Sequence, residues 1–193
     1  MYEYITGTFH ELAPAHLVLD SAGTGFFVNI SLNTFSALSG KESGKIFLHQ
    51  VVREDALLLF GFADKDEREL FRQLITVSGI GANTARVMLS SLSPADIRKS
   101  IASGNVEVLK GVKGIGLKSA QRIIVDLRDK LGKTDGGGEI FAGADNTIRE
   151  ESLSALIMLG FSRNAVEKVI NQLLNDGEVK TAEDLVKRAL KKL

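Results

Sequence analysis

The 193-residue chain contains no cysteine and no tryptophan. Without cysteine the protein can form no disulfide bond, no thiolate metal site and no thiol nucleophile. Its three histidines, His10, His16 and His49, are scattered along the sequence without the spacing of metal ligands. We therefore expect isolated core or surface histidines, no metal centre and no cofactor.

Long apolar runs are also missing. No segment approaches the ~18 consecutive apolar residues needed to cross a bilayer. The first residues, MYEYITGTFHEL, lack the charged-then-apolar pattern of a signal peptide. We therefore expect a cytoplasmic protein without membrane contact. Apolar residues make up 44% of the chain, which is enough to build the cores of one to three small domains.

The net charge is zero, but the charge is unevenly distributed. Residues 1–62 contain three Lys or Arg against six Asp or Glu, a net charge of −3. Residues 63–131 contain twelve against eight, a net charge of +4. An acidic first third followed by a basic middle suggests that any polyanion binds to the middle segment.

Residues 1–63 have the pattern of a small β-domain. Short segments rich in Val, Ile, Phe and Leu are separated by Gly, Asn, Ser or charged residues. They are YEYITGTF (2–9), HLVLD (16–20), GFFVNISL (25–32), KIFLHQVVR (45–53) and ALLLFGF (56–62). Five strands in about sixty residues fit an OB-type barrel whose phenylalanines alternate as core residues. An SH3-like barrel is the alternative.

The remaining sequence has the pattern of helices. Three helices are predicted in residues 64–131: DERELFRQLITV (66–77), a helix that begins at Ser93 and Pro94 and ends at Gly104, and KSAQRIIVDLRDKL (118–131). Residues 132–145, GKTDGGGEIFAGAD, are typical of a flexible linker. Residues 146–193 are predicted to form a three-helix, UBA-like module. The predicted fold class is thus multidomain α+β.

The segment KGVKGIGLKS, residues 110–119, nearly matches the phosphate loop of ATPases. Gly111 and Gly116 have the Walker A spacing, but Leu117 separates the second glycine from the Lys-Ser pair. The upstream residues are short and polar rather than a buried strand. IIVD (123–126) imitates the second Walker strand but begins too soon after the loop for a helix and a further strand to intervene. Nucleotide binding is therefore disfavoured.

The same segment has a second copy in the chain. GIGANTARVML at residue 79 and GIGLKSAQRII at residue 114 align at an offset of 35 residues. A Walker loop occurs once per site, whereas an internal repeat indicates a repeated structural unit. The paired residues are Gly79 with Gly114, Ile80 with Ile115, Gly81 with Gly116, Thr84 with Ser119, and Ala85 with Ala120.

An apolar-Gly-x-Gly repeat is typical of tandem helix-hairpin-helix motifs. The isoleucines would pack inward, and the glycines would let the backbone approach a phosphate at the start of the next helix. Such a contact reads the DNA backbone and not the bases. Lys118, Arg122 and Arg128 follow the second copy. The predicted DNA-binding residues are Gly79, Ile80, Gly81, Asn83, Thr84, Gly114, Ile115, Gly116, Lys118, Ser119 and Arg122.

From end to end the chain resembles the RuvA family, the DNA-binding subunits of the Holliday junction branch migration complex. The resemblance lies in VVREDALLLFGF (51–62), GIG at 79, GIGLKSAQRIIVDLRDKL at 114 and LGF at 159. It implies a β-barrel domain (1–63), a DNA-binding domain (64–131), a linker and a C-terminal domain (146–193). One departure is Asn83, where a basic residue is common, so the first motif is expected to bind more weakly.

The resemblance also implies an assembly. It predicts a homotetramer, or two tetramers face to face, that holds a four-way junction open and square. The chain itself would be non-catalytic, because the hexameric ATPase RuvB drives branch migration and the resolvase RuvC cuts the junction. Glu54 and Asp55 would form a central acidic pin that repels phosphates, although charged residues are also common in ordinary turns. The predicted RuvB contacts are Leu156, Leu159, Gly160 and Phe161, of which Leu156 is equally suited to a core position.

Two other classes of function are weighed against this one. A base-excising glycosylase needs a catalytic lysine or aspartate and aromatic residues around a flipped base. The chain lacks tryptophan, and Asp126 lies on a helix with a structural pattern. A single-strand or RNA binder needs exposed aromatic residues in a basic groove, whereas this barrel is acidic. Comparing the affinities for junction, duplex and single strand at equal salt separates these classes.

Overall fold

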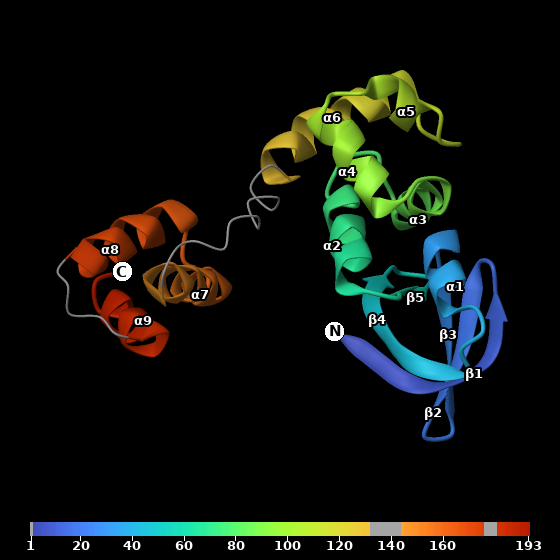
Figure 1. Ribbon diagram of the computed structural model, residues 1–193, viewed down its shortest axis with the longest axis horizontal. Helices are drawn as coiled ribbons and strands as arrows, with labels where there is room; N and C mark the ends of the chain where they lie inside the picture. Colours follow the sequence, from blue (N-terminus) through green and yellow to red (C-terminus); the bar gives the residue numbers. More distant parts are fainter. Residues whose placement is uncertain (1, 132–143, 176–180) are drawn as a thin grey trace. The chain divides into compact units, whose positions relative to one another are not determined.

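The computed structural model describes residues 2–131, 144–175 and 181–193. The chain divides into two compact units, Met1–Gly136 and Gly137–Leu193 (Figure 1). Across the described ranges, no helix combines the length and the apolar character needed to cross a membrane.

The first unit begins with a closed five-stranded barrel of the OB type. Its strands are β1 (Tyr4–Ala13), β2 (His16–Ser21), β3 (Thr24–Ile30), β4 (Ser43–Val52) and β5 (Leu57–Phe62). They are ordered β1-β2-β3-β5-β4, and β4 closes the barrel against β1. The β3–β5 pair is parallel and the other pairs are antiparallel. All five predicted strands are present, but β1 runs four residues past its predicted end.

A helix that was not predicted, α1 (Leu32–Leu38), lies between β3 and β4. Ser31 caps it by accepting a hydrogen bond from the Thr34 amide (3.0 Å). Leu38 of α1 joins the barrel core, which contains Leu17, Leu19, Val28, Ile30, Ile46, Leu48 and Leu59. The prediction that the phenylalanines alternate as core residues is wrong for Phe27, which is 57% exposed and stacks on His16.

The helices of the first unit are α2 (Lys65–Leu74), α3 (Ala82–Ser91), α4 (Pro94–Ala102), α5 (Val106–Lys110) and α6 (Leu117–Leu131). As predicted, Ser93 caps α4 and Pro94 occupies its first turn. The first predicted helix ends at Leu74 and not at residue 77. Phe60 and Phe62 of β5 pack on Phe71 of α2, so a second core joins the barrel to the helices.

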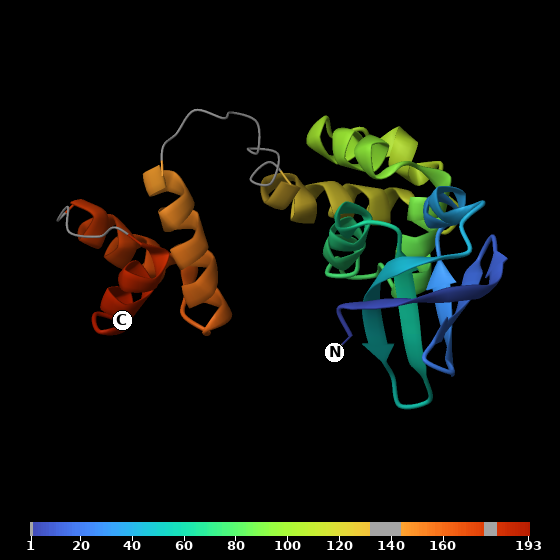
Figure 2. The same ribbon diagram turned by 60° about the horizontal axis from the view of Figure 1, so that its bottom comes forward.

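The second unit contains α7 (Ala144–Met158), α8 (Arg163–Asn175) and α9 (Ala182–Leu190), the three predicted helices (Figure 2). They pack around one core, formed by Leu153, Leu156, Val166, Ile170, Leu173, Leu185 and Ala189. The predicted linker, residues 132–145, falls outside the described residues except for its last two, which begin α7.

Candidate nucleic-acid interface

Two hairpins of helices repeat the same backbone geometry. The first joins α2 to α3 and the second joins α5 to α6. Their turn hydrogen bonds recur 35 residues apart: Ile80 N–H to Val77 C=O and Ile115 N–H to Val112 C=O (both 3.0 Å), and Ala85 N–H to Gly81 C=O and Ala120 N–H to Gly116 C=O (both 2.9 Å). The repeat seen in the sequence is therefore a structural repeat.

The glycines of each hairpin differ in what the fold requires of them. Gly79 and Gly114 have φ angles of +89° and +91°. A residue with a side chain is strained in this left-handed conformation, whereas glycine is not. Gly81 and Gly116 are not in that region, and a Cβ atom built on either would meet nothing within 4 Å. The fold thus needs glycine at 79 and 114 but does not itself require glycine at 81 and 116.

The helices that follow these glycines begin without side-chain caps. Side chains of Ser31, Asp64, Ser93 and Asn105 accept from the first amides of α1, α2, α4 and α5. No side-chain cap serves α3, and α6 follows a glycine, which has no side chain to offer. Neither α3 nor α6 has an acidic residue in its first turn. Both helix starts therefore present free N–H donors and an uncompensated positive dipole end.

The predicted DNA-binding residues fall into three groups by exposure. Ile80 and Ile115 are 4% and 5% exposed and pack into the core, as predicted, so only their backbones can face a ligand. Thr84 and Ser119 are half-buried. The rest are exposed: Gly79, Gly81, Asn83, Gly114, Gly116, Lys118 and Arg122.

Positive charge is unequal between the hairpins. Lys113 and Lys118 flank the second turn and are exposed, with no ion pair to any described residue. The matching residues of the first hairpin, Ser78 and Asn83, are neutral. Arg122 of α6 donates from Nη1 to the Ser78 carbonyl (3.2 Å), which places its guanidinium beside the first turn. Lys113 was not predicted, although its position just before Gly-Ile-Gly was visible in the sequence.

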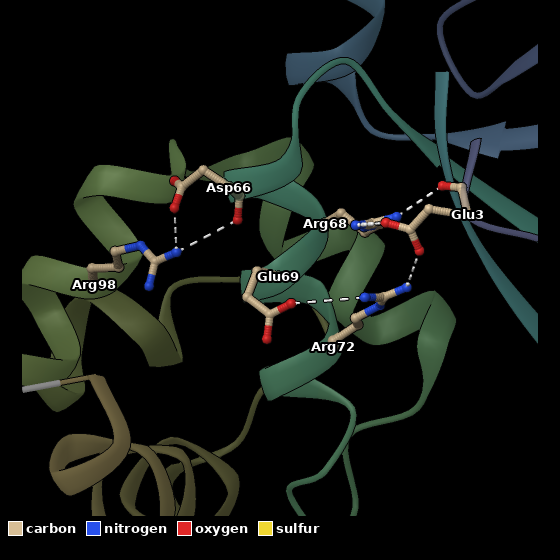
Figure 3. Close-up of polar contacts among 6 residues, drawn as sticks. All are labelled: Glu3, Asp66, Arg68, Glu69, Arg72 and Arg98. Atoms are coloured by element: carbon tan, nitrogen blue, oxygen red, sulfur yellow. Dashed lines mark hydrogen bonds and ion pairs between the residues drawn. The ribbon is translucent and has the colours of Figure 1, made fainter. Parts of the chain in front are cut away.

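Other arginines in the helical region are paired within the chain (Figure 3). Arg68 contacts the Glu3 carboxylate at 2.5 Å and the Glu3 carbonyl at 2.8 Å. The hydrogen bond from Arg68 to the Glu3 carboxylate, together with the positive charges of Arg68 and Arg72, lowers the pKa of Glu3. Arg98 contacts Asp66 at 2.6 Å. These ion pairs neutralise arginines on α2 and α4, so the basic character of the segment is not spread evenly over its surface.

Glu54 and Asp55 lie at the tip of the β4–β5 hairpin, as predicted. The turn closes through a hydrogen bond from the Arg53 amide to the Ala56 carbonyl (2.8 Å). Both acidic side chains are exposed, and the hairpin projects beyond the barrel (Figure 2). Among the described residues, neither has an ion-pair partner. The tip therefore exposes two carboxylates that are not held in ion pairs, beside the exposed side chain of Arg53.

Residues 159–161, with the sequence LGF, form the C-terminal cap of α7. Gly160 has φ +98°, and its amide donates to the Ile157 carbonyl (3.0 Å) while the Phe161 amide donates to the Leu156 carbonyl (3.2 Å). This pair of bonds is the Schellman motif, which requires a residue in the left-handed region. Leu156 is fully buried and Phe161 packs partly buried against the same core. Leu156 therefore occupies the core position that its sequence suited equally well.

The exposed residues at this helix end are apolar. Ile157, Met158 and Leu159 are 38%, 85% and 60% exposed. Met158 was not among the predicted contact residues, although it lies in the same LIMLGF run. We call these three residues the α7 patch.

Models of known protein families match both ends of this chain. A model described as the RuvA N terminal domain matches residues 1–61, and one described as the RuvA, C-terminal domain matches residues 147–193. Relatives from Bacteroides thetaiotaomicron, Christiangramia forsetii and Flavobacterium psychrophilum are 49%, 46% and 44% identical, each over the full length of both chains. Each is named Holliday junction branch migration complex subunit RuvA.

The chain belongs to the RuvA family. Between the two RuvA models, a third, described as a SAM-like helix-hairpin-helix tandem, matches residues 71–129. That range contains both hairpin turns and the helices α3 and α5. The tandem motif predicted from the repeat is therefore confirmed. The RuvA N terminal model covers the barrel up to β5, and the RuvA C-terminal model covers α8, α9 and most of α7.

Proposed function

We propose that this chain binds four-way DNA junctions through the backbone amides of its two hairpins, as the non-catalytic DNA-binding subunit of a branch migration complex. The observation that carries the proposal is the pair of uncapped helix starts behind Gly81 and Gly116. Amide donors and the positive end of a helix dipole bind phosphate without reading bases. Such binding suits a complex that must move along DNA of any sequence.

Each hairpin takes one phosphate. In the second, the amides from Gly116 onward bind the anion, and Lys118 adds a charge. In the first, Asn83 donates without charge, and Arg122, held at the Ser78 carbonyl, supplies the missing cation. The two sites on one chain therefore grip one duplex arm, one site on each strand.

A four-way junction has four arms, so four copies of the chain would engage it. A closed four-fold ring follows from repeating one subunit contact. The acidic tips of Glu54 and Asp55 would gather at the crossover, where they repel phosphates and hold the strands apart. RuvB would supply ATP hydrolysis and RuvC the cleavage. The barrel (1–63) would then keep the strands apart, and the hairpin domain (64–131) would bind the DNA arms. The C-terminal domain (146–193) would recruit RuvB.

The acidic tip provides the test of this function. Glu54→Gln with Asp55→Asn removes two charges that face phosphate only at a junction centre. We expect the affinity for a four-way junction to hold or rise and the preference for junction over duplex to fall about tenfold, or about 1.4 kcal/mol. Fluorescence anisotropy with both DNAs at one salt concentration measures this ratio.

The matched control is Glu11→Gln with Glu42→Gln, which removes two exposed charges of the same barrel away from the tip. This variant is expected to keep the selectivity of the unmodified protein. An equal loss of selectivity in both double variants would show that net charge, and not the position of the tip, sets the preference. A preference for single strands over the junction in the unmodified protein would contradict the proposed function itself.

A further inference from the structure

Four consecutive residues at the start of α1, the cap Ser31 and the first three helical residues Leu32 to Thr34, all bind the helical region. The Ser31 and Thr34 hydroxyls both donate to the carboxylate of Glu67 in α2, from Thr34 at 2.6 Å. Glu67 is only 2% exposed. Burial raises its pKa, and the two hydroxyl hydrogen bonds oppose that rise. These contacts fasten α1 to α2.

The middle two residues of the turn bind α3 instead. The Leu32 amide donates to the Ser90 hydroxyl (3.1 Å). Asn33 donates from Nδ2 to the carbonyls of Leu89 (2.5 Å) and Leu92 (3.0 Å). Carbonyls in the last turn of a helix have no partner within it, so Asn33 satisfies the C-terminal end of α3.

The two helices held in this way, α2 and α3, are the two arms of the first hairpin (Figure 1). The second hairpin differs, because no hydrogen bond joins a described barrel residue to α5 or α6. The first hairpin is thus clamped to the barrel that carries the acidic tip, and it is also the hairpin whose turn has no flanking lysine, since Ser78 and Asn83 stand where the second has Lys113 and Lys118.

We propose that the first turn of α1 is a positioning clamp for the first phosphate site, and that Asn33 is the residue that sets α3. This inference rests on the proposed function, since it assigns a residue that acts through the amides behind Gly81. An uncharged amide site depends steeply on donor distance and angle. Because α3 is a short rigid rod, fixing its C-terminal end at Asn33 fixes the amides at its other end.

Asn33 is a cleaner probe than Glu67. Removal of Ser31 and Thr34 hydroxyls would leave a buried carboxylate without partners, and loss of Glu67 would disturb α1 and α2 together. Asn33→Ala removes only the two bonds to α3, at the end of the helix remote from the phosphate site.

The test is a double-mutant cycle on junction affinity, measured with the full-length chain by fluorescence anisotropy. Asn33→Ala alone is expected to weaken junction binding about fivefold. In a Gly81→Val background, where the first site is already blocked, Asn33→Ala should add no further loss. In a Gly116→Val background, where only the second site is blocked, the fivefold loss should remain. Asn33→Leu, which keeps about the same size but cannot donate and adds no charge, should behave like Asn33→Ala.

A general loss of stability would weaken binding equally in both backgrounds, and that result would overturn the positioning role. So would unchanged affinity on Asn33→Ala alone. The proposed function fails separately, if Gly81→Val and Gly116→Val both bind the junction as the unmodified chain does. If each glycine variant weakens binding but Asn33→Ala adds to both alike, only the clamp is rejected.

Discussion

Gly116→Val is expected to weaken four-way junction binding about a hundredfold, the equivalent of two amide–phosphate hydrogen bonds at about 1.4 kcal/mol each. The free energy of unfolding should change little, because Gly116 has no positive φ and a Cβ atom there meets nothing within 4 Å. The isopropyl group would instead cover the free amides at the start of α6. Fluorescence anisotropy and chemical denaturation of the same preparations measure both quantities.

Gly114→Val is the matched control two residues away. Gly114 has φ +91°, so a β-branched residue strains the turn and lowers the free energy of unfolding. Loss of binding in this variant would accompany loss of stability, whereas in Gly116→Val it should not. A Gly116→Val protein that binds the junction with unmodified affinity would remove the amides of α6 from the binding site.

Met158→Ser with Leu159→Ser is expected to reduce stimulation of the RuvB ATPase at least about tenfold, while junction affinity stays unchanged. These side chains belong to the α7 patch, are 85% and 60% exposed and pack against no core, so their apolar surface is available to a partner. Deletion of residues 146–193 should have the same effect. ATP hydrolysis and branch migration assays with a synthetic junction measure the stimulation.

Phe27→Ser is the control for removing exposed apolar surface elsewhere, since Phe27 is 57% exposed on the barrel. It should leave stimulation intact. Phe161→Ala tests a different property, because Phe161 packs against the core of the second unit and its removal should lower the melting temperature of that unit. Full stimulation by the Met158 and Leu159 double variant would place the partner site elsewhere.

The elements with a strong periodic pattern were predictable. In the five strands, apolar residues either alternate with polar ones or follow one another without a break. Helix α4 begins with a serine cap followed by proline, which marks its start in the sequence. Helix α1 was missed for a physical reason. Its seven residues, LNTFSAL, are too few for a stable isolated helix. It is held by Glu67 and by contacts to α3, which are distant in sequence.

The candidate site was predictable as a repeat but not in its details. The 35-residue offset identified both hairpins, yet only φ angles separate Gly114, which the turn requires, from Gly116, which it does not. The contact between Arg122 and Ser78 joins residues 44 positions apart and leaves no local pattern. Exposure of Met158 beside buried Leu156 likewise depends on where α7 ends.

Hydrogen exchange of the full-length chain with and without a four-way junction tests the central claim most directly. Amides in the first turn of a helix lack an acceptor within it and exchange readily when no ligand is bound. On junction binding, exchange should slow at residues 81–84 and 116–119, and it should stay the same in β3, residues 24–30. Unchanged exchange at both helix starts, with protection on the barrel strands β2 and β3 instead, would contradict phosphate binding by the hairpins.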